Sequence, residues 1–152
     1  DAMAHVLALL MPTNNLICRV LLHTGLRLGD VLLFRKENVK RRFTIIEQKT
    51  GKRRVVNLTD ELVRELTLGG GSGWCFPNAR DSSRHRTRSA VWRDVHRAAK
   101  ALRYKGVSPH STRKCFAVEH YQKNKDIAKT QKILKIFGSF KNMLYLCTAF
   151  PL

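Results

Sequence analysis

The feature that most restricts the fold of this chain is one change of hydrophobic period within an otherwise helical pattern. Residues 41–59, RRFTIIEQKTGKRRVVNLT, carry apolar residues on both sides of a Thr50-Gly51 pair: Phe43, Ile45, Ile46, Val55, Val56 and Leu58. β-Branched and aromatic residues that flank a short turn with glycine predict an antiparallel β-hairpin. The rest of the chain must be arranged around this small sheet.

Outside the hairpin, apolar residues recur at helical spacing, and turn residues divide them into segments. Pro12, Asn14 and Asn15 interrupt the first stretch, and Gly25 ends the second. The expected helices cover residues 3–11, 15–24, 28–34, 60–67, 88–103, 110–122 and 126–137, with a last short one around Tyr145. The candidate core residues are Leu7, Leu9, Leu10, Val20, Leu21, Leu22, Leu62, Leu66, Val91, Val95, Ala98 and Ala99. The pattern predicts a mainly α fold with a small antiparallel β-sheet, in the α+β class.

The charge of the chain is extreme and unevenly distributed. Lys and Arg number 29 against 11 Asp and Glu, which gives a net charge of +18. Residues 35–58 hold nine basic and two acidic residues, and residues 80–125 hold thirteen and three. A field of this sign attracts polyanions. The two basic blocks therefore predict the walls of a groove for double-stranded DNA, with RNA as the alternative.

Other features bear on the location of the protein. No apolar run is long enough to span a bilayer, and the chain begins with a helical pattern and not with a secretory signal. Cys18, Cys75, Cys115 and Cys147 are widely scattered without zinc-binding spacing, which predicts reduced thiols. We therefore expect a cytoplasmic protein with no membrane partner, no metal and no cofactor.

Five residues lie in short motifs that can act together on a phosphate ester. They are Arg27 in TGLRLGD, Lys49 in QKTGK at the hairpin turn, His110 and Arg113 in HSTR, and Tyr145 in an apolar segment. His110 and Arg113 are three residues apart, so they share one helix face. Each motif alone is common, but their order and spacing form a specific signal.

In this order the motifs closely resemble the tyrosine recombinase family. The catalytic domain of that family carries an arginine turn, a hairpin lysine, HxxR, a His or Trp, and finally the nucleophilic tyrosine. The similar segments are TGLRLGD, EQKTGKRRVVNL, SPHSTRKCFAVEHY and, more loosely, TQKILKIFGSFKNMLYL. The resemblance covers nearly the whole chain and implies the tyrosine-recombinase catalytic-domain fold. It also implies site-specific DNA recombination, as integration or excision, by a tetramer assembled on DNA.

The chemistry of phosphoryl transfer explains why these residue types are needed. Arg27 and Arg113 can each donate two hydrogen bonds to the non-bridging oxygens and so stabilise an anionic transition state. A tyrosine hydroxyl has a pKa of about 10 and needs a proton acceptor, for which His110 is the candidate. Lys49 is a suitable acid for the departing 5′ oxygen. The covalent 3′-phosphotyrosine retains the bond energy, so rejoining needs neither ATP nor metal.

Two positions near the motifs qualify this interpretation. Nine residues before Tyr145, where the family has His or Trp, the chain has Ile136, which cannot donate a hydrogen bond to a phosphate. Asp30, at the acidic position of the arginine turn, is expected to brace either Arg27 or a neighbouring amide.

The other tyrosines are weaker candidates for the nucleophile. Tyr104 lies in a basic segment, where DNA contact is expected, and Tyr121 lies on the HxxR helix, where it fits a core or supporting role. Tyr145 is therefore the predicted nucleophile.

Further basic residues are expected to contact DNA grooves and backbone. They are Lys52, Arg53, Arg54, Arg84, Arg86, Arg88, Arg93 and Arg97. Because family members usually carry an N-terminal core-binding domain, we expect residues 1–152 to be a single catalytic domain from a longer protein. Three alternatives stay open: a catalytically impaired DNA-binding module, supported by Ile136, a type IB topoisomerase, and an RNA-binding protein with exposed aromatic platforms.

Overall fold

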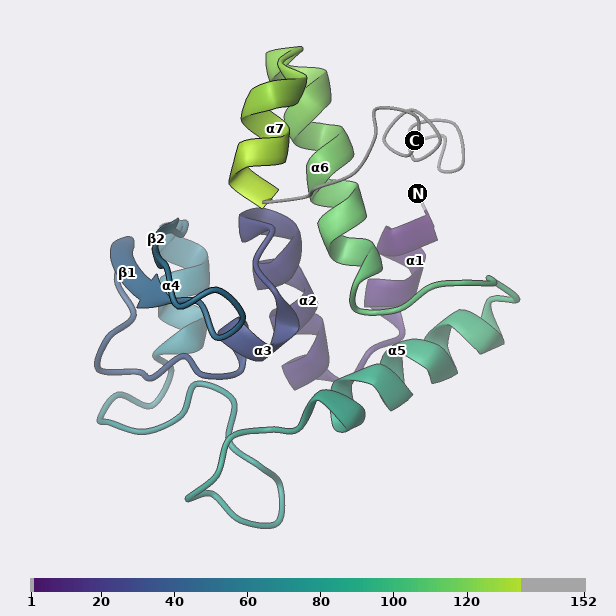
Figure 1. The fold of residues 1–152 in the computed structure, drawn as a ribbon. Helices are drawn as coiled ribbons and strands as arrows, with labels where there is room; N and C mark the ends of the chain where they lie inside the picture. Colours follow the sequence, from purple (N-terminus) through teal and green to yellow (C-terminus); the bar gives the residue numbers. More distant parts are fainter. Residues whose placement is uncertain (1, 135–152) are drawn as a thin grey trace.

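The structure is a computed structural model that describes residues 2–134 (Figure 1). Its elements are α1 (Ala2–Ala8), α2 (Pro12–Thr24), α3 (Leu28–Val31), β1 (Arg42–Ile46), β2 (Arg53–Asn57), α4 (Asp60–Leu66), α5 (Arg88–Ala101), α6 (Ser111–Asn124) and α7 (Ile127–Leu134). A mainly helical fold with a small antiparallel sheet is confirmed. The helix expected around Tyr145 lies outside the described residues.

The break between the first two helices lies earlier than the sequence pattern predicted. The helix expected over 3–11 ends at Ala8, and Pro12, which we interpreted as part of an interruption, begins α2. Proline fits there because its fixed φ suits a helix and the first turn needs no N–H donor. Leu9 falls in the link and is 42% exposed, so its predicted place in the core is wrong, whereas Leu10 is buried.

The predicted hairpin is confirmed, with β1 antiparallel to β2 and Phe43 opposite Val56. Phe43 and Ile45 pack against the core, whereas Ile46 is 66% exposed. Because side chains alternate along a strand, the inward phase of β1 continues to Glu47, whose side chain is 1% exposed. The hairpin therefore brings a carboxylate into the interior beside its turn.

Helix α2 lies in the middle of the fold and packs against α6 (Figure 1). Gly25 ends α2 as predicted, with a φ of 65° and an N–H that donates to the Leu21 carbonyl at 2.8 Å. A Cβ placed on Gly25 would lie 2.5 Å from Cδ1 of Phe116 on α6. Glycine thus permits both the left-handed turn and the close approach of the two helices, just before Arg27.

Side-chain caps begin the later helices close to the predicted positions. Thr59 accepts a hydrogen bond from the N–H of Leu62 at 3.3 Å, and Asp126 accepts one from Lys129 at 2.9 Å. The predicted helix over 88–103 ends at Ala101, and the short helix expected over 28–34 is limited to Leu28–Val31. The predicted apolar face of α5, including Val91 and Val95, is buried.

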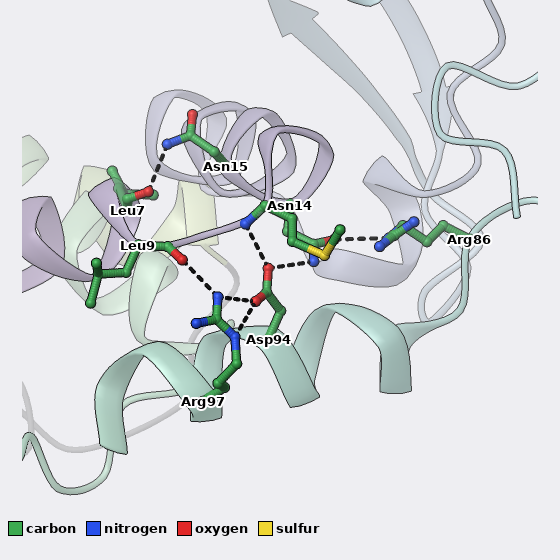
Figure 2. A network of polar contacts seen from close by, with 8 residues as sticks. Leu7, Leu9, Asn14, Asn15, Arg86, Asp94 and Arg97 are labelled. Carbon is green, nitrogen blue, oxygen red and sulfur yellow. Dashed lines mark hydrogen bonds and ion pairs between the residues drawn. The ribbon is translucent and has the colours of Figure 1, made fainter. Parts of the chain in front are cut away.

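A polar cluster ties α5 to the start of α2 (Figure 2). Asp94 accepts hydrogen bonds from the N–H of Met11 at 2.9 Å and from Nδ2 of Asn14 at 2.7 Å. Arg97 donates to Oδ1 of Asp94 at 2.6 Å, and Arg86 Nε donates to Oδ1 of Asn14 at 2.8 Å. We refer to Asn14, Arg86, Asp94 and Arg97 as the scaffold cluster.

The cysteines of the described residues are Cys18, Cys75 and Cys115, and all three are free thiols. Burial raises the pKa of Cys18 to about 12. Cys147 lies outside the described residues. Over the part of the chain that the structure describes, none of the helices combines the length and the apolar character that a membrane crossing needs.

Candidate active site

Three parts of the fold bring predicted catalytic residues to one cleft of about 850 Å³. Arg27 stands at the start of α3, Lys49 lies in the β1–β2 turn, and His110 and Arg113 lie at the start of α6. The other residues that line the cleft are Leu26, Leu28, Gly29, Asp30, Gln48, Arg88, Trp92, Ser108 and Pro109. The structure thus gathers these four side chains, which lie far apart in the sequence, around one cavity.

Arg27 and Arg113 line the cleft, and Arg54 lies near enough for its charge to act on Arg113. Arg113 is 7% exposed, and burial, together with the charges of Arg27 and Arg54, lowers its pKa to about 10. Burial also lowers the pKa of Arg54, whose Nη2 donates to the Thr24 carbonyl at 2.8 Å. A pKa of about 10 leaves Arg113 charged near neutral pH, so it contributes positive potential to the cleft.

His110 precedes the first turn of α6 and lines the same cleft. Partial desolvation, and the nearby charges of Arg113, Lys114 and Arg27, lower its pKa below the usual value for histidine. The imidazole is therefore neutral at pH 7, and one of its ring nitrogens can accept a proton.

A buried carboxylate that sequence reasoning missed connects the hairpin to these cations. The Glu47 oxygens lie 3.6 Å from Nη1 of Arg27 and 3.5 Å from Nη1 of Arg54, and Thr50 Oγ1 donates to Oε2 of Glu47 at 2.7 Å. The signal was present in the sequence, because the inward phase of Phe43 and Ile45 falls on Glu47. We refer to Arg27, Asp30, Glu47, Arg54 and Arg113 as the cleft cluster.

Asp30 supports the hairpin turn from the other side. It is 4% exposed, and its Oδ1 accepts a hydrogen bond from the backbone N–H of Gln48 at 2.9 Å. Of the two partners considered for Asp30, the structure shows the neighbouring amide, whereas Arg27 forms its ion pair with Glu47. Asp30 therefore ties α3 to the residue just before Lys49.

Helix α5 forms one wall of the cleft. Arg88 Nη2 donates to Oε1 of Gln48 at 3.2 Å. Trp92, which the sequence analysis did not single out, is 49% exposed and stacks on His96 with ring centroids 4.8 Å apart. The spacing of Trp92 and His96 by four residues on an arginine-rich helix could have indicated this aromatic surface.

The residues predicted to contact DNA fall into two groups. Lys52, Arg53, Arg84, Arg88, Arg93 and Arg97 have exposed side chains, Arg54 and Arg86 are partly buried, and DNA contact stays a prediction for all eight. Arg86 and Arg97 belong to the scaffold cluster, and Arg54 belongs to the cleft cluster. These three guanidinium groups therefore have partners within the protein as well.

The predicted nucleophile Tyr145 and the substituted position Ile136 lie outside the described residues. Of the other tyrosines, Tyr104 places its hydroxyl 3.0 Å from Nδ1 of His5, and Tyr121 lies under the ammonium of Lys125. Neither Tyr104 nor Tyr121 lines the cleft. Between residues 2 and 134, moreover, no group of three His, Cys, Asp or Glu side chains could hold a metal ion.

Comparison with known proteins identifies the family. The sequence model of the phage integrase family matches residues 3–135. This chain belongs to the phage integrase family. It is 29% identical over 146 residues to the integrase of Escherichia phage P2, covering 95% of this chain and 41% of the phage protein. It is 26% identical over 131 residues to the probable integrase/recombinase YoeC of Bacillus subtilis strain 168, covering 82% and 72%.

Solved structures of recombinases share the fold of this integrase-family chain. The XerA recombinase matches with a TM-score of 0.68 and 20% identity, over 99% of this chain and 61% of that protein. A lambda integrase fragment, as a dimer bound to a COC′ core site, matches with a TM-score of 0.68 and 18% identity, over 96% and 56%. The expected family and the tyrosine-recombinase catalytic-domain fold are confirmed. The chain spans less than half of the phage P2 integrase.

Proposed function

We propose that this integrase-family chain is the catalytic domain of a tyrosine recombinase, which performs site-specific DNA integration or excision through Tyr145. The observation that supports it most is that Arg27, Lys49, His110 and Arg113 line one cleft. These side chains are in place before any substrate binds, which is the condition for stabilising charge that grows in a transition state.

In the proposed reaction, the Tyr145 oxygen attacks the scissile phosphorus, and the bond from phosphorus to the 5′ oxygen breaks. Arg27 and Arg113 bind the non-bridging oxygens throughout. His110, neutral at pH 7, takes the tyrosine proton, and Lys49 gives a proton to the 5′ oxygen. The products are a 3′-phosphotyrosine and a free 5′ hydroxyl, and attack by a new 5′ hydroxyl reverses the steps and rejoins the strand.

The proposed substrate is double-stranded DNA. The proposed assembly is a tetramer on two duplexes, because recombination exchanges four strands and the active site of each subunit cleaves one. The exposed cations of the hairpin and of α5 flank the cleft, where they can neutralise phosphates on either side of the scissile one.

A nicked duplex that loses its short 5′ fragment on cleavage tests the proposal. The chain should form a covalent protein–DNA adduct that resists denaturation, and Tyr145→Phe should form none. An adduct that persists in Tyr145→Phe, or the absence of any adduct with the unaltered chain, would overturn the assignment of Tyr145. Recombination between paired sites, beyond relaxation of a supercoiled plasmid, separates a recombinase from a type IB topoisomerase.

A second candidate function is DNA binding by a catalytically impaired member of the same fold. Ile136 favours it, because isoleucine supplies no hydrogen-bond donor where the family has His or Trp. Under this alternative the unaltered chain binds DNA without forming an adduct. The variants Ile136→His and Ile136→Trp should then restore cleavage if the missing donor is the cause.

A further inference from the structure

Glu47 stands out because it is a fully buried acid beside a cleft whose proposed substrate is an anion. Its side chain is 1% exposed, in contrast to the exposed Lys49 two residues later. A negative charge here opposes the binding of a phosphate, and burying it carries a desolvation penalty. The presence of a buried carboxylate at this position therefore calls for a role other than substrate binding.

The backbone and the side chain of Glu47 both hold the turn that carries Lys49. The N–H of Glu47 donates to the Lys52 carbonyl at 3.0 Å, and its carbonyl accepts from the N–H of Gly51 at 2.8 Å. The Thr50 hydroxyl donates to Oε2 of Glu47 at 2.7 Å. The backbone N–H, the backbone carbonyl and the carboxylate of Glu47 therefore all bind residues of the turn.

The same carboxylate also reaches across to the cations of the cleft. Oε2, the oxygen that accepts from Thr50, lies 3.6 Å from Nη1 of Arg27, and Oε1 lies 3.5 Å from Nη1 of Arg54. Arg54 is in turn fixed to the end of α2 by its bond to the Thr24 carbonyl. One oxygen therefore links the Lys49 turn directly to Arg27.

We propose that Glu47 is a positioning residue that couples the Lys49 turn to the Arg27 guanidinium, so that the proton donor and the phosphate-binding cation keep one relative placement. This inference rests on the proposed function. Lys49 has a long and flexible side chain, and the rate of proton transfer to a leaving oxygen depends on where its turn is held.

The coupling predicts opposite effects on binding and on chemistry. In Glu47→Gln the amide keeps the shape of the side chain but loses the charge that attracts Arg27. The cleft becomes more positive, so DNA binding should stay within about twofold or become tighter. Cleavage at saturating DNA should slow by about 10- to 100-fold, because the acid and the cation lose their fixed relation. A purely structural role predicts instead weaker folding with the same cleavage rate per folded molecule.

The experiment measures three quantities on the full chain: the single-turnover rate of adduct formation at saturating nicked duplex, the Kd by fluorescence anisotropy, and the Tm. Thr50→Val is the second variant, since it removes the hydroxyl bond to Glu47 and leaves every charge in place. Asp94→Asn is the matched control, because it neutralises another buried carboxylate, in the scaffold cluster, outside the cleft. We expect slow cleavage in the first two variants and cleavage within about twofold of the unaltered chain in the third.

A substrate with a sulfur atom in place of the scissile 5′ oxygen isolates the contribution of the acid. A thiolate leaves without a proton, so this substrate should remove most of the defect of Thr50→Val and part of the defect of Glu47→Gln. Cleavage by Glu47→Gln within about twofold of the unaltered chain would overturn the inference, as would weaker DNA binding with unchanged cleavage. If the unaltered chain forms no adduct, the proposed function itself is rejected. The results for the Glu47 variants bear only on the positioning role and do not test the proposed function.

Discussion

The scaffold cluster and the cleft cluster both combine arginines with buried carboxylates, but they differ in how deeply the arginines are buried. In the scaffold cluster, Asp94 receives hydrogen bonds from a backbone amide, from Asn14 and from Arg97. Burial raises the pKa of Asp94, but these hydrogen bonds outweigh it and leave that pKa below its usual value. The hydrogen bonds of Asn14, Arg86, Asp94 and Arg97 connect α2 with α5, and the side chain of Arg97 stays 56% exposed.

The arginines of the cleft cluster are more deeply buried, with 24% of the Arg27 side chain and 14% of the Arg54 side chain exposed. Arg27, Arg54 and Arg113 surround Glu47 and Asp30, and His110 and Lys49 add further basic groups at the opening. The pKa of Arg113 falls to about 10 because burial and the other arginines disfavour its charge. We infer that a buried cation with a lowered pKa, and not a buried ion pair as such, marks the place where a phosphate is expected to bind.

The largest effect that separates the two clusters is expected from Arg113→Gln. Cleavage should fall by about 100- to 1,000-fold, because the variant removes two hydrogen-bond donors from the transition state. The Tm should stay equal or rise, since the charged form of Arg113 is disfavoured in the folded state. Single-turnover cleavage and thermal unfolding monitored by circular dichroism measure both.

Asp94→Asn provides the opposite result in the same two measurements. It should destabilise the fold by about 1 to 3 kcal/mol, because it leaves donors of the scaffold cluster without their charged acceptor. A fall in the Tm of Arg113→Gln as large as that of Asp94→Asn would show that the two clusters are equivalent.

A smaller difference between the two clusters is expected in the rise of the Tm that DNA binding causes. A short duplex at about 100 times its Kd should stabilise the chain by about 2.7 kcal/mol, which raises the Tm by several degrees. Arg113→Gln should lose part of this shift, whereas Arg97→Gln should keep it. If Arg97→Gln also loses the shift, Arg97 contacts DNA, and the separation between the two clusters is less sharp than their contacts indicate.

The pH dependence of cleavage tests the protonation state of His110. Because its pKa lies below 6.5, the rate should be flat just above pH 7 and should fall toward about tenfold per pH unit at pH values below that pKa. Stability should fall in the same acidic window, since the unfolded chain binds the proton more tightly than the folded one. In His110→Gln the acidic limb of the rate profile should disappear. If the acidic limb of the rate profile remains in His110→Gln, the titrating group is not His110.

The smallest expected effect concerns Trp92. Trp74→Phe leaves Trp92 as the single tryptophan of the chain, and its fluorescence should change on DNA binding because its indole lines the cleft. Trp92→Ala should weaken DNA binding by about fivefold, on the order of 1 kcal/mol. The complementary variant Trp92→Phe retains Trp74, which contacts Arg35 and His85 away from the cleft, and its fluorescence should change little. An equal response from Trp74 would contradict the placement of DNA along α5.

Sequence patterns were sufficient for the hairpin, for the end of α2 at Gly25 and for the four basic residues of the cleft. Each of these depends on local chemistry, namely strand alternation, a left-handed turn, or a motif of a few residues. Pro12 was misinterpreted because proline both interrupts and begins helices, and the choice depends on the chain before it.

Long-range polar pairing could not be predicted from the same patterns. Asn14 and Asp94 lie 80 residues apart, and nothing local indicates that they meet. The partners of Arg86 and Arg97 within the protein could not be predicted, because a guanidinium within a basic block gives no local sign of a polar group that it contacts. The burial of Glu47 could have been predicted from the alternation of side chains along β1. Its pairing with Arg27 and Arg54 could not, because that pairing depends on the tertiary fold.

Gly25 has a consequence for judging which related chains are active. It lets the end of α2 approach Phe116 on α6. Arg27 closely follows α2 and Arg113 lies on α6, so we expect a side chain at residue 25 to move the two arginines apart. A chain could keep every side chain of the cleft and still hold its two phosphate-binding arginines too far apart, if residue 25 carried a side chain. An inventory of catalytic residues would count such a chain as competent, whereas an inventory that includes this glycine would not.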